Sequence, residues 1–353
     1  MKKPKYLKEA AAVVLTVTAC VFIFLNSNEI SQGVSNGLSL CAASVIPSMF
    51  PFLVVSDFIA KSGISKIAGG VILKPLGKVL RISDNGCTVF IMSLLGGYPI
   101  GPEMTSELAE SGKIELKEAQ RLNLFCINPS PGFLITMLGA VFFKSKALGV
   151  IFYVSCALAS FVIAFASSFF KRSSEQKSTK NERLYFINNP VDSLVKSVSS
   201  ATMSMLFICA WVVVFNAVIS VFLYYFQNKA AYVLCSLLEI TNGINLVKGI
   251  LSFPLCAALI AFGGVSVHFQ ILSAVRKSGL KLHIFLLSRV IHALISGVFC
   301  RLILIVFPVK ADVFSNYSAL TVNSFSVSFA ASATLIAMCI LFILEVDANK
   351  KVC

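Results

Sequence analysis

The sequence has few charged residues, and this scarcity decides its class. Only 13% of its 353 residues are Asp, Glu, Lys or Arg, whereas an ordinary soluble domain carries about 25%. Hydrophobic residues make up 57%, and they gather in uncharged runs of roughly the 20 residues that a helix needs to cross a bilayer. The composition therefore predicts an all-α, polytopic membrane protein and excludes an ordinary soluble domain.

Sequence signatures of enzymes and metal sites are missing as well. The chain has no phosphate loop and no HExxH, GxSxG or CxxC pattern. Its eleven cysteines are spread through apolar stretches, which is typical of small buried side chains, and His283 and His292 have no third ligand nearby. We therefore expect no enzymatic activity, no metal and no cofactor.

Acidic residues are about half as frequent as basic ones, 16 against 30, which gives a net charge of +14. The basic residues lie in short clusters between apolar runs, a pattern that favours anionic lipid headgroups over nucleic acid as the partner. Lys2, Lys3 and Lys5 place the N-terminus in the cytoplasm, and we interpret the apolar run that follows as a retained anchor rather than a signal peptide.

The apolar runs divide the chain into a first membrane half, 1–170, and a second, 191–346. Together the halves hold about eight or nine membrane segments, some of them broken or re-entrant. In chain order the parts are an anchor at 10–25, a first repeat at about 37–143, a span at 147–170, a basic cytoplasmic linker at 171–190, a second repeat within 191–346 and a tail at 347–353.

Glycine and proline interrupt several of these runs. Pro47 and Pro51 each remove a backbone hydrogen bond, so the run 37–59 is expected to kink or break. The glycine- and proline-rich run 96–102 cannot continue a helix and predicts a turn at membrane depth, followed by two helical pieces. A third interruption lies at 128–132.

The interruptions suggest an internal repeat. Gly96-Gly97 precedes Ser111-Gly112 by the distance at which Gly263-Gly264 precedes Ser278-Gly279, since 263 − 96 and 278 − 111 both equal 167. If 197–228 is the only span between the linker and the second copy, the two repeats are inverted. The basic residues that follow the second double glycine favour the opposite arrangement, so both topologies stay open.

Paired glycine- and proline-interrupted segments in two halves are a sequence pointer to a binding site near the bilayer midplane. Free N–H and C=O groups at such breaks must be paired with side chains, water or a solute. The candidate solute-binding residues are Gly96, Gly97, Tyr98, Pro99, Gly101, Asn128, Ser130, Glu239, Thr241, Asn242, Gly263, Gly264 and His268.

Several of these side chains also have a plain structural interpretation. Glu239 is either a site for a proton, cation or solute, or a residue whose carboxylate reaches the headgroups. Glu103 and Glu107 share one helix face and are expected chiefly to complement the helix dipole. His268 is either a proton acceptor or, more often for a lone histidine, a hydrogen-bonded packing residue. Arg289 and Arg301 either pair with a carboxylate or reach the interface, and we expect the interface.

Four stretches resemble a known family; they are Gly37 to Phe52, Gly96 to Gly101, Glu118 to Leu122, and Leu238 to Gly243. At these residues the chain resembles the YlbJ group of sporulation integral membrane proteins, within the wider nucleoside-recognition, or Gate, domain family. The resemblance implies a role in endospore formation, at the stage of the spore cortex or spore maturation, in the cell membrane or the membranes of the developing spore.

The resemblance leaves two functions open. The Gate relationship implies recognition or transport of a small polar solute, similar to that of concentrative nucleoside transporters. The alternative is an assembly or scaffold factor that acts with other sporulation membrane proteins and moves nothing. A solute site requires the polar residues at the breaks to face away from lipid and to lie within about 15 Å of one another, half the thickness of the hydrocarbon core.

Overall fold

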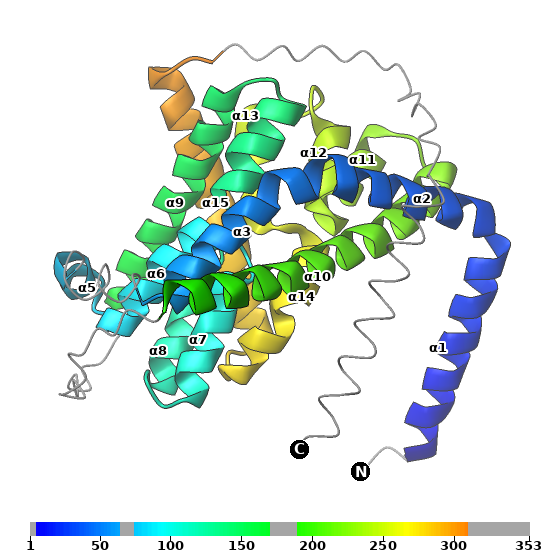
Figure 1. Ribbon diagram of the computed structural model, residues 1–353. Helices are drawn as coiled ribbons and strands as arrows, with labels where there is room; N and C mark the ends of the chain where they lie inside the picture. The colour runs from blue at the N-terminus through cyan, green and yellow to red at the C-terminus, as the bar shows by residue number, and fades with distance from the viewer. Residues whose placement is uncertain (1–4, 64–73, 170–188, 310–353) are drawn as a thin grey trace. The chain divides into compact units, whose positions relative to one another are not determined.

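The architecture is helical throughout the part of the chain that the structure describes. The computed structural model describes residues 5–63, 74–169 and 189–309, with side chains from residue 13 onward except at position 74, and this part contains no β-strand (Figure 1). It lies within one compact unit, Met1–Val313. The prediction of an all-α protein is therefore confirmed, while most of the linker and a last predicted span at 325–344 lie outside the described residues.

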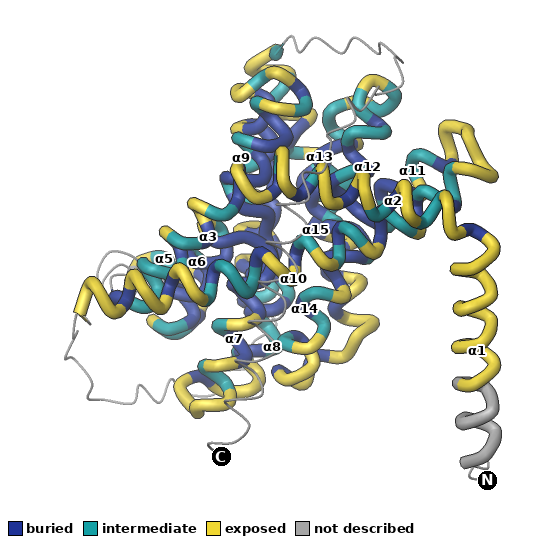
Figure 2. Tube along the Cα trace, turned by 45° about the vertical axis from the view of Figure 1, so that its right-hand side comes forward, coloured by how far each residue is buried: buried dark blue, intermediate teal, exposed yellow. Residues whose placement is uncertain are grey.

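The N-terminal helix α1 (Lys5–Leu25) contains the predicted anchor. Its hydrophobic side chains from Val13 onward are exposed, and Figure 2 shows this exposure along the described length of the helix. The helix that follows, α2 (Ser27–Leu40), contains polar residues, and it places Gly33 and Gly37 against another helix.

The predicted break at Pro47 and Pro51 is replaced by a local widening of the helix. A π-helical turn, η1 (Cys41–Val45), connects α2 to α3 (Ile46–Lys61), so that 27–61 forms one continuous helix of 35 residues. Pro47 lies in the first turn of α3, where the missing N–H costs little, and the wide turn before it makes room for the ring. Of the two predicted outcomes, a kink or a break, the break was therefore wrong, and the kink stays a prediction.

Five helices in the described part are long and apolar enough to cross a membrane: Ser27–Lys61, Lys146–Ser168, Pro190–Tyr225, Phe253–Lys277 and Leu282–Val306. Three shorter apolar helices accompany them: Val13–Leu25, Gly132–Phe142 and Lys229–Leu238. The total of about eight or nine segments stays a prediction.

The first half folds into a helical hairpin, a broken helix and a long helix. The hairpin consists of α6 (Asp84–Gly96) and α7 (Ile100–Glu110), preceded by the short α5 (Lys74–Leu80). After Ser111 and Gly112 the chain forms α8 (Leu116–Leu122), loses helical structure, and resumes as the π-helical η3 (Gly132–Phe142). The long helix α9 (Lys146–Ser168) begins where the Ser145 side chain accepts a hydrogen bond from the N–H of Leu148.

The described part of the second half contains six helices. Its helices are α10 (Pro190–Tyr225), α11 (Lys229–Leu238), α12 (Ile240–Val247), α13 (Phe253–Phe262), α14 (Gly264–Lys277) and α15 (Leu282–Val306). α11 and α12 form a second tightly packed hairpin, since a side-chain carbon at Gly243 would lie 2.2 Å from the Cα of Ser236. α13 and α14 form a broken helix, and α15 is the long helix that follows.

Small residues set the packing of α2 against α10. A side-chain carbon at Gly33 would lie 2.6 Å from the carbonyl oxygen of Asn216, and one at Gly37 would lie 2.9 Å from the Cα of Val213. The two backbones therefore approach closely, as small residues four apart allow in membrane helices. The order of these contacts makes the two helices antiparallel.

The helices α7 and α14 run in the same direction. At their N-terminal ends, the Tyr98 hydroxyl donates to the carbonyl of Ile260 and the Tyr98 ring lies beside Gly263. At their C-terminal ends, Lys277 Nζ lies 3.1 Å from Glu110 Oε1. The register of 167 residues therefore pairs two parallel helices. An inverted repeat in that register requires antiparallel ones, so the inverted arrangement considered for it is wrong. An internal repeat as such stays a prediction.

Candidate functional site

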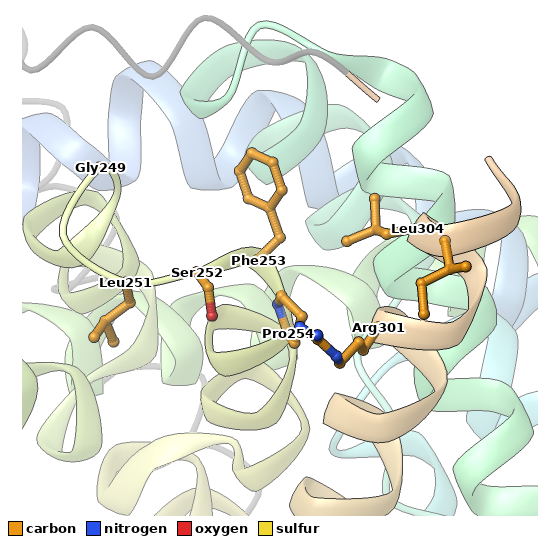
Figure 3. Close-up of a pocket in the computed structure, with 8 residues that line it drawn as sticks. Gly249, Leu251, Ser252, Phe253, Pro254, Arg301 and Leu304 are labelled. Carbon is orange, nitrogen blue, oxygen red and sulfur yellow. The ribbon is translucent and has the colours of Figure 1, made fainter. Parts of the chain in front are cut away.

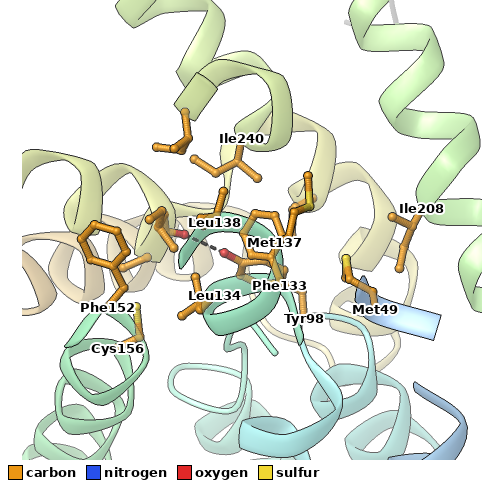
Figure 4. Close-up of a cluster of buried hydrophobic side chains, with 14 of the residues drawn as sticks. Met49, Tyr98, Phe133, Leu134, Met137, Leu138, Phe152, Cys156, Ile208 and Ile240 are labelled. Atoms are coloured by element: carbon orange, nitrogen blue, oxygen red, sulfur yellow. Dashed lines mark hydrogen bonds between the residues drawn. The ribbon is translucent and has the colours of Figure 1, made fainter. Parts of the chain in front are cut away.

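The tip of the first hairpin is a glycine turn that places Tyr98 in the interior. α6 ends at Gly96, and Gly97 has a φ of +93°, which favours glycine. A side-chain carbon at Gly97 would lie 3.1 Å from the Cβ of Ser130. Tyr98 is 7% exposed, and its hydroxyl donates to the carbonyl of Ile260 at 2.6 Å (Figure 4). The tip therefore contacts the breaks of both halves.

The break between α8 and η3 has its carbonyl groups satisfied by side chains. Arg289 donates to the carbonyls of Leu124 and Ile127, the latter at 2.8 Å, and the amide of Asn128 donates to the carbonyl of Phe125 at 3.0 Å. Arg289 is 1% exposed, so the expectation that it reaches the interface was wrong. Its charge is instead stabilised by carbonyl oxygens of the segment that follows α8.

The tip of the second hairpin is organised by Glu239. This residue is 1% exposed, and its two carboxylate oxygens accept hydrogen bonds from the N–H groups of Thr241 at 2.8 Å and Asn242 at 2.7 Å. The headgroup interpretation of Glu239 was therefore wrong. The Asn242 side chain donates to Asn216 at 2.7 Å. A side-chain carbon at Gly264 would lie 3.2 Å from a backbone nitrogen of this tip, so the tip lies against the second break.

The second break, at Gly263, is closed in the same manner as the first. Gly263 has a φ of +92°, and α13 ends there. The last three carbonyls before it each lie beside a polar side chain. The carbonyl of Ile260 accepts a hydrogen bond from Tyr98. The carbonyl oxygen of Ala261 lies 3.2 Å from Nδ1 of His292, and that of Phe262 lies 2.9 Å from Nε2 of His268. His268 therefore lies at the break and is a hydrogen-bonded packing residue, as the second of its two interpretations had it.

A chain of buried polar side chains joins the two breaks. Asn128 donates to Ser93 Oγ at 3.2 Å and accepts from Ser160, whose Oγ lies 3.0 Å from Nε2 of His292. The same ring nitrogen lies 3.0 Å from the Cys156 carbonyl. Nothing in the sequence marks Ser93 or Ser160, because single serines in apolar helices commonly bond only to their own backbone.

The structure thus brings most of the predicted residues to one centre. Gly97, Tyr98, Asn128 and Ser130 come from the first half, and Glu239, Thr241, Gly263, Gly264 and His268 come from the second. Asn242 is half-buried beside this centre. Gly96 and Gly101 allow close packing. A side-chain carbon at Gly96 would lie 2.5 Å from the Ile100 side chain, and one at Gly101 would lie 1.7 Å from the Cys126 carbonyl oxygen. Pro99 precedes the first residue of α7. Glu103 and Glu107 lie exposed on α7, away from the centre.

Two buried polar atoms at this centre lack a hydrogen-bond partner. They are Oγ of Ser266, in the first turn of α14, and Nε of Arg289. Ser266 is 1% exposed, and an unpaired buried polar group is costly unless a ligand or water completes it. One hydroxyl and one N–H group therefore keep an unused hydrogen-bonding capacity in the interior.

The chain is similar to the sporulation integral membrane protein YlbJ of Bacillus subtilis (strain 168). The two are 23% identical over 333 residues, which cover 81% of each chain. No family model matches the chain, and no solved structure matches it. With the five apolar spans, this similarity establishes that the chain is a multi-pass membrane protein, similar over most of its length to a sporulation integral membrane protein.

Proposed function

We propose that this protein acts in endospore formation, at the stage of the spore cortex or spore maturation, and that it binds or transports a small polar solute through a Gate-type fold. The solute site is the centre at which two hairpin tips and two broken helices meet. The observation that carries the proposal is this convergence, because four separate interruptions of apolar segments come together at one place.

The arrangement of elements supports an inverted repeat in a register other than 167. Each half runs in the order long helix, hairpin, broken helix, long helix. The hairpin α6–α7 opens at the end of the molecule that holds Ser111 and Ser278, since Glu110 pairs there with Lys277. The hairpin α11–α12 opens at the opposite end, where Lys248 lies over the ring of Phe142. The two hairpins therefore enter from opposite sides.

The contact between α9 and α15 has the symmetry that such a repeat requires. Cys156 Sγ lies 3.4 Å from Ser296 Oγ, and Ser160 Oγ lies 3.0 Å from His292. The contacts make the helices antiparallel, and α15 begins at Leu282, 136 residues after α9 begins at Lys146. We infer an inverted repeat with an offset near 136 residues, whose pseudo-two-fold axis passes between these helices.

This arrangement gives a route to alternating access. Each hairpin tip touches the break of the broken helix in the second half, through Tyr98 in one case and Gly264 in the other. Withdrawal of one tip opens the centre to one side of the membrane while the other tip stays closed. Glycines at both contacts keep the contact surfaces small, which suits a movement of one rigid hairpin against the rest.

The alternative is a membrane assembly factor that has the same fold and moves nothing. In favour of it, nearly every polar group at the centre is paired within the chain, as a purely structural core requires. The unpartnered atoms of Ser266 and Arg289 and the burial of Asn128, Ser130, Glu239 and Thr241 favour the solute site.

The two functions are separated by an uptake experiment. Proteoliposomes that contain the full chain are incubated with a small-molecule extract of sporulating cells, and their contents are measured by mass spectrometry. We expect at least one polar compound to accumulate with the wild type and not with Gly97→Leu, which fills the contact with Ser130. Gly112→Leu is the matched control, because Gly112 also has a positive φ and has no atom within 4 Å.

Spore formation provides the second measurement. The wild type and Glu239→Gln are expressed in a B. subtilis strain that lacks YlbJ, and heat-resistant spores are counted. Solute transport predicts that a variant defective in uptake also fails to restore spores. Normal uptake by a variant that fails to restore spores would favour the assembly role.

A further inference from the structure

A pocket of about 440 Å³ lies at the end of the molecule opposite the Ser111 and Ser278 turns. It is formed by the loop after α12, the first turn of α13 and the last turns of α15 (Figure 3). Ser252 and Arg301 are its polar lining residues, and Leu251, Phe253, Leu304 and Ile305 contribute apolar walls. It is separate from the candidate solute centre, because α15 reaches the centre at Arg289 and His292, two to three turns earlier.

The polar side of this pocket has groups that can bind an anion. Figure 3 shows the Arg301 side chain extended toward Pro254 at the start of α13. Arg301 is exposed and forms no ion pair with an acidic residue of the described chain. α13 begins after Ser252, whose hydroxyl makes no capping hydrogen bond. Pro254 has no N–H, so this turn offers the N–H groups of Phe253 and Leu255; together with a guanidinium they match the oxygens of a phosphate group.

Further positive charge surrounds the pocket without acidic counterparts. Lys248 precedes the lining loop and lies 5.7 Å from the centre of the Phe142 ring. Burial and the nearby charge of Lys144 lower the pKa of Lys248. The described loops at this end, at 143–145, 226–228, 248–252 and 307–309, contain no Asp or Glu. The local field therefore favours a negatively charged occupant.

The apolar side of the pocket continues along the surface of α15. Leu294, Val298, Leu302 and Ile305 follow one another at spacings of three or four residues and are 66%, 59%, 52% and 68% exposed. This stripe runs from the middle of the span to the pocket wall. A free phosphate ion makes no favourable contact with such an apolar stripe, whereas the acyl chains of a lipid would lie along it.

We propose that the pocket binds the phosphate of an anionic phospholipid, with its acyl chains along the exposed stripe of α15. Arg301 and the first turn of α13 hold the phosphate, and Lys248 adds to the attraction. The lipid lies in the leaflet on the side at which α11 and α12 open.

The test measures lipid binding to the full-length protein in detergent by native mass spectrometry. The probes are phosphatidylglycerol, phosphatidylcholine and inorganic phosphate. We expect wild type to bind phosphatidylglycerol in preference to phosphatidylcholine, and Arg301→Gln to bind it about tenfold more weakly, as the loss of one charge-assisted hydrogen bond implies. Lys281→Gln, which removes an exposed charge at the other end of α15, should bind as wild type does.

Ser252→Asp is a second variant that does not depend on Arg301. Aspartate is a favourable first residue before a helix, so the fold is retained while a negative charge enters the pocket; we expect weaker binding of phosphatidylglycerol. Equal binding of the two lipids, or unchanged binding in both pocket variants, would overturn the proposal. Displacement of phosphatidylglycerol by millimolar inorganic phosphate would overturn the assignment to a lipid and identify a free anion site instead.

Discussion

Among the described residues, the buried charges of Arg289 and Glu239 are held by backbone groups rather than by opposite charges. Arg289 donates to two carbonyls of the first break, Glu239 accepts from two N–H groups at the second hairpin tip, and the half-buried Arg121 donates to carbonyls of Arg81, after α5, and Ala164 in α9. Each charge sits at the end of a helical segment where the backbone dipoles favour its sign. The same groups that make the centre polar therefore also fix the ends of its broken helices.

Arg289→Leu should destabilise the protein by roughly 2 kcal/mol, because it leaves the carbonyls of Leu124 and Ile127 buried without donors. Thermal unfolding of the purified protein in detergent measures the change. Arg276→Leu is the control, since Arg276 is exposed on α14 and should change stability by less than about 0.5 kcal/mol. Equal effects of the two substitutions would contradict the role assigned to Arg289.

Glu239→Ala should lower stability by about 1 kcal/mol, the usual effect of removing a side chain that caps a helix. Glu239→Gln should lower it less, because the remaining carbonyl oxygen still accepts one of the two N–H groups. The unfolding midpoints of the two variants are compared under one set of conditions. A larger loss for the glutamine variant would show that the charge itself, and not the cap, holds the tip.

Sequence patterns identified which residues are unusual but not what they touch. A carboxylate and an arginine within apolar runs are conspicuous, and both proved to be buried at the centre. Their partners could not be predicted, because Arg289 bonds to carbonyls that lie 162 and 165 positions away in the chain. Ser93 and Ser160 carried no signal at all, since their importance arises only from the packing of α6 and α9 around Asn128.

At the scale of elements, glycine predicted the helix ends well, alone or together with proline. Glycine and proline mark the turn at 96–102 and the interruption before η3, and glycine alone marks the end of α7 before Gly112; all three appear near their expected positions. Proline alone was a poorer guide, because the π-helical turn η1 absorbs Pro47 without a break. The second hairpin tip, at Glu239, contains neither residue and is set by packing against Gly264.

The antiparallel contact of α9 and α15 can be tested by a single substitution. Ser296→Cys places a second sulfur near Cys156, whose Sγ lies 3.4 Å from the present Ser296 oxygen. Mild oxidation should join the two residues, and mass spectrometry of proteolytic peptides detects the linked pair. Ser288→Cys, two turns away on the same helix and also buried, should form no link to Cys156; a link there would exclude the register of 136.

Gly33→Val should weaken the packing of α2 on α10, because the new side chain would meet the backbone of Asn216 and Ala217. Overpacking of this kind costs roughly 1–3 kcal/mol. The unfolding midpoint in detergent measures the loss. Leu38→Val, at an exposed position on the same helix, should have little effect, and comparable losses for the two variants would argue against a close contact at Gly33.

At the scale of the whole molecule, the directions of α7 and α14 bear on the question that the charge pattern left open, which side of the protein holds the basic residues after the second double glycine. Since α7 and α14 run in the same direction, the basic residues after α14 share a side with those after α7, in keeping with a cytoplasmic location for both. The register of 167 had matched similar glycine turns in two different settings, the tip between α6 and α7 and the break between α13 and α14. A double glycine marks a break, but it does not distinguish a hairpin tip from a broken helix.

The most direct measurement determines from which side each hairpin opens. In a background with Cys20 and Cys353 replaced by serine, Lys113→Cys and Lys248→Cys are labelled with a membrane-impermeant thiol reagent in sealed vesicles of known orientation. Because the two hairpins open at opposite ends of the molecule, we expect the two positions to be labelled from opposite sides of the membrane. Labelling of both from the same side would contradict the inverted hairpins and, with them, the solute site at their meeting point.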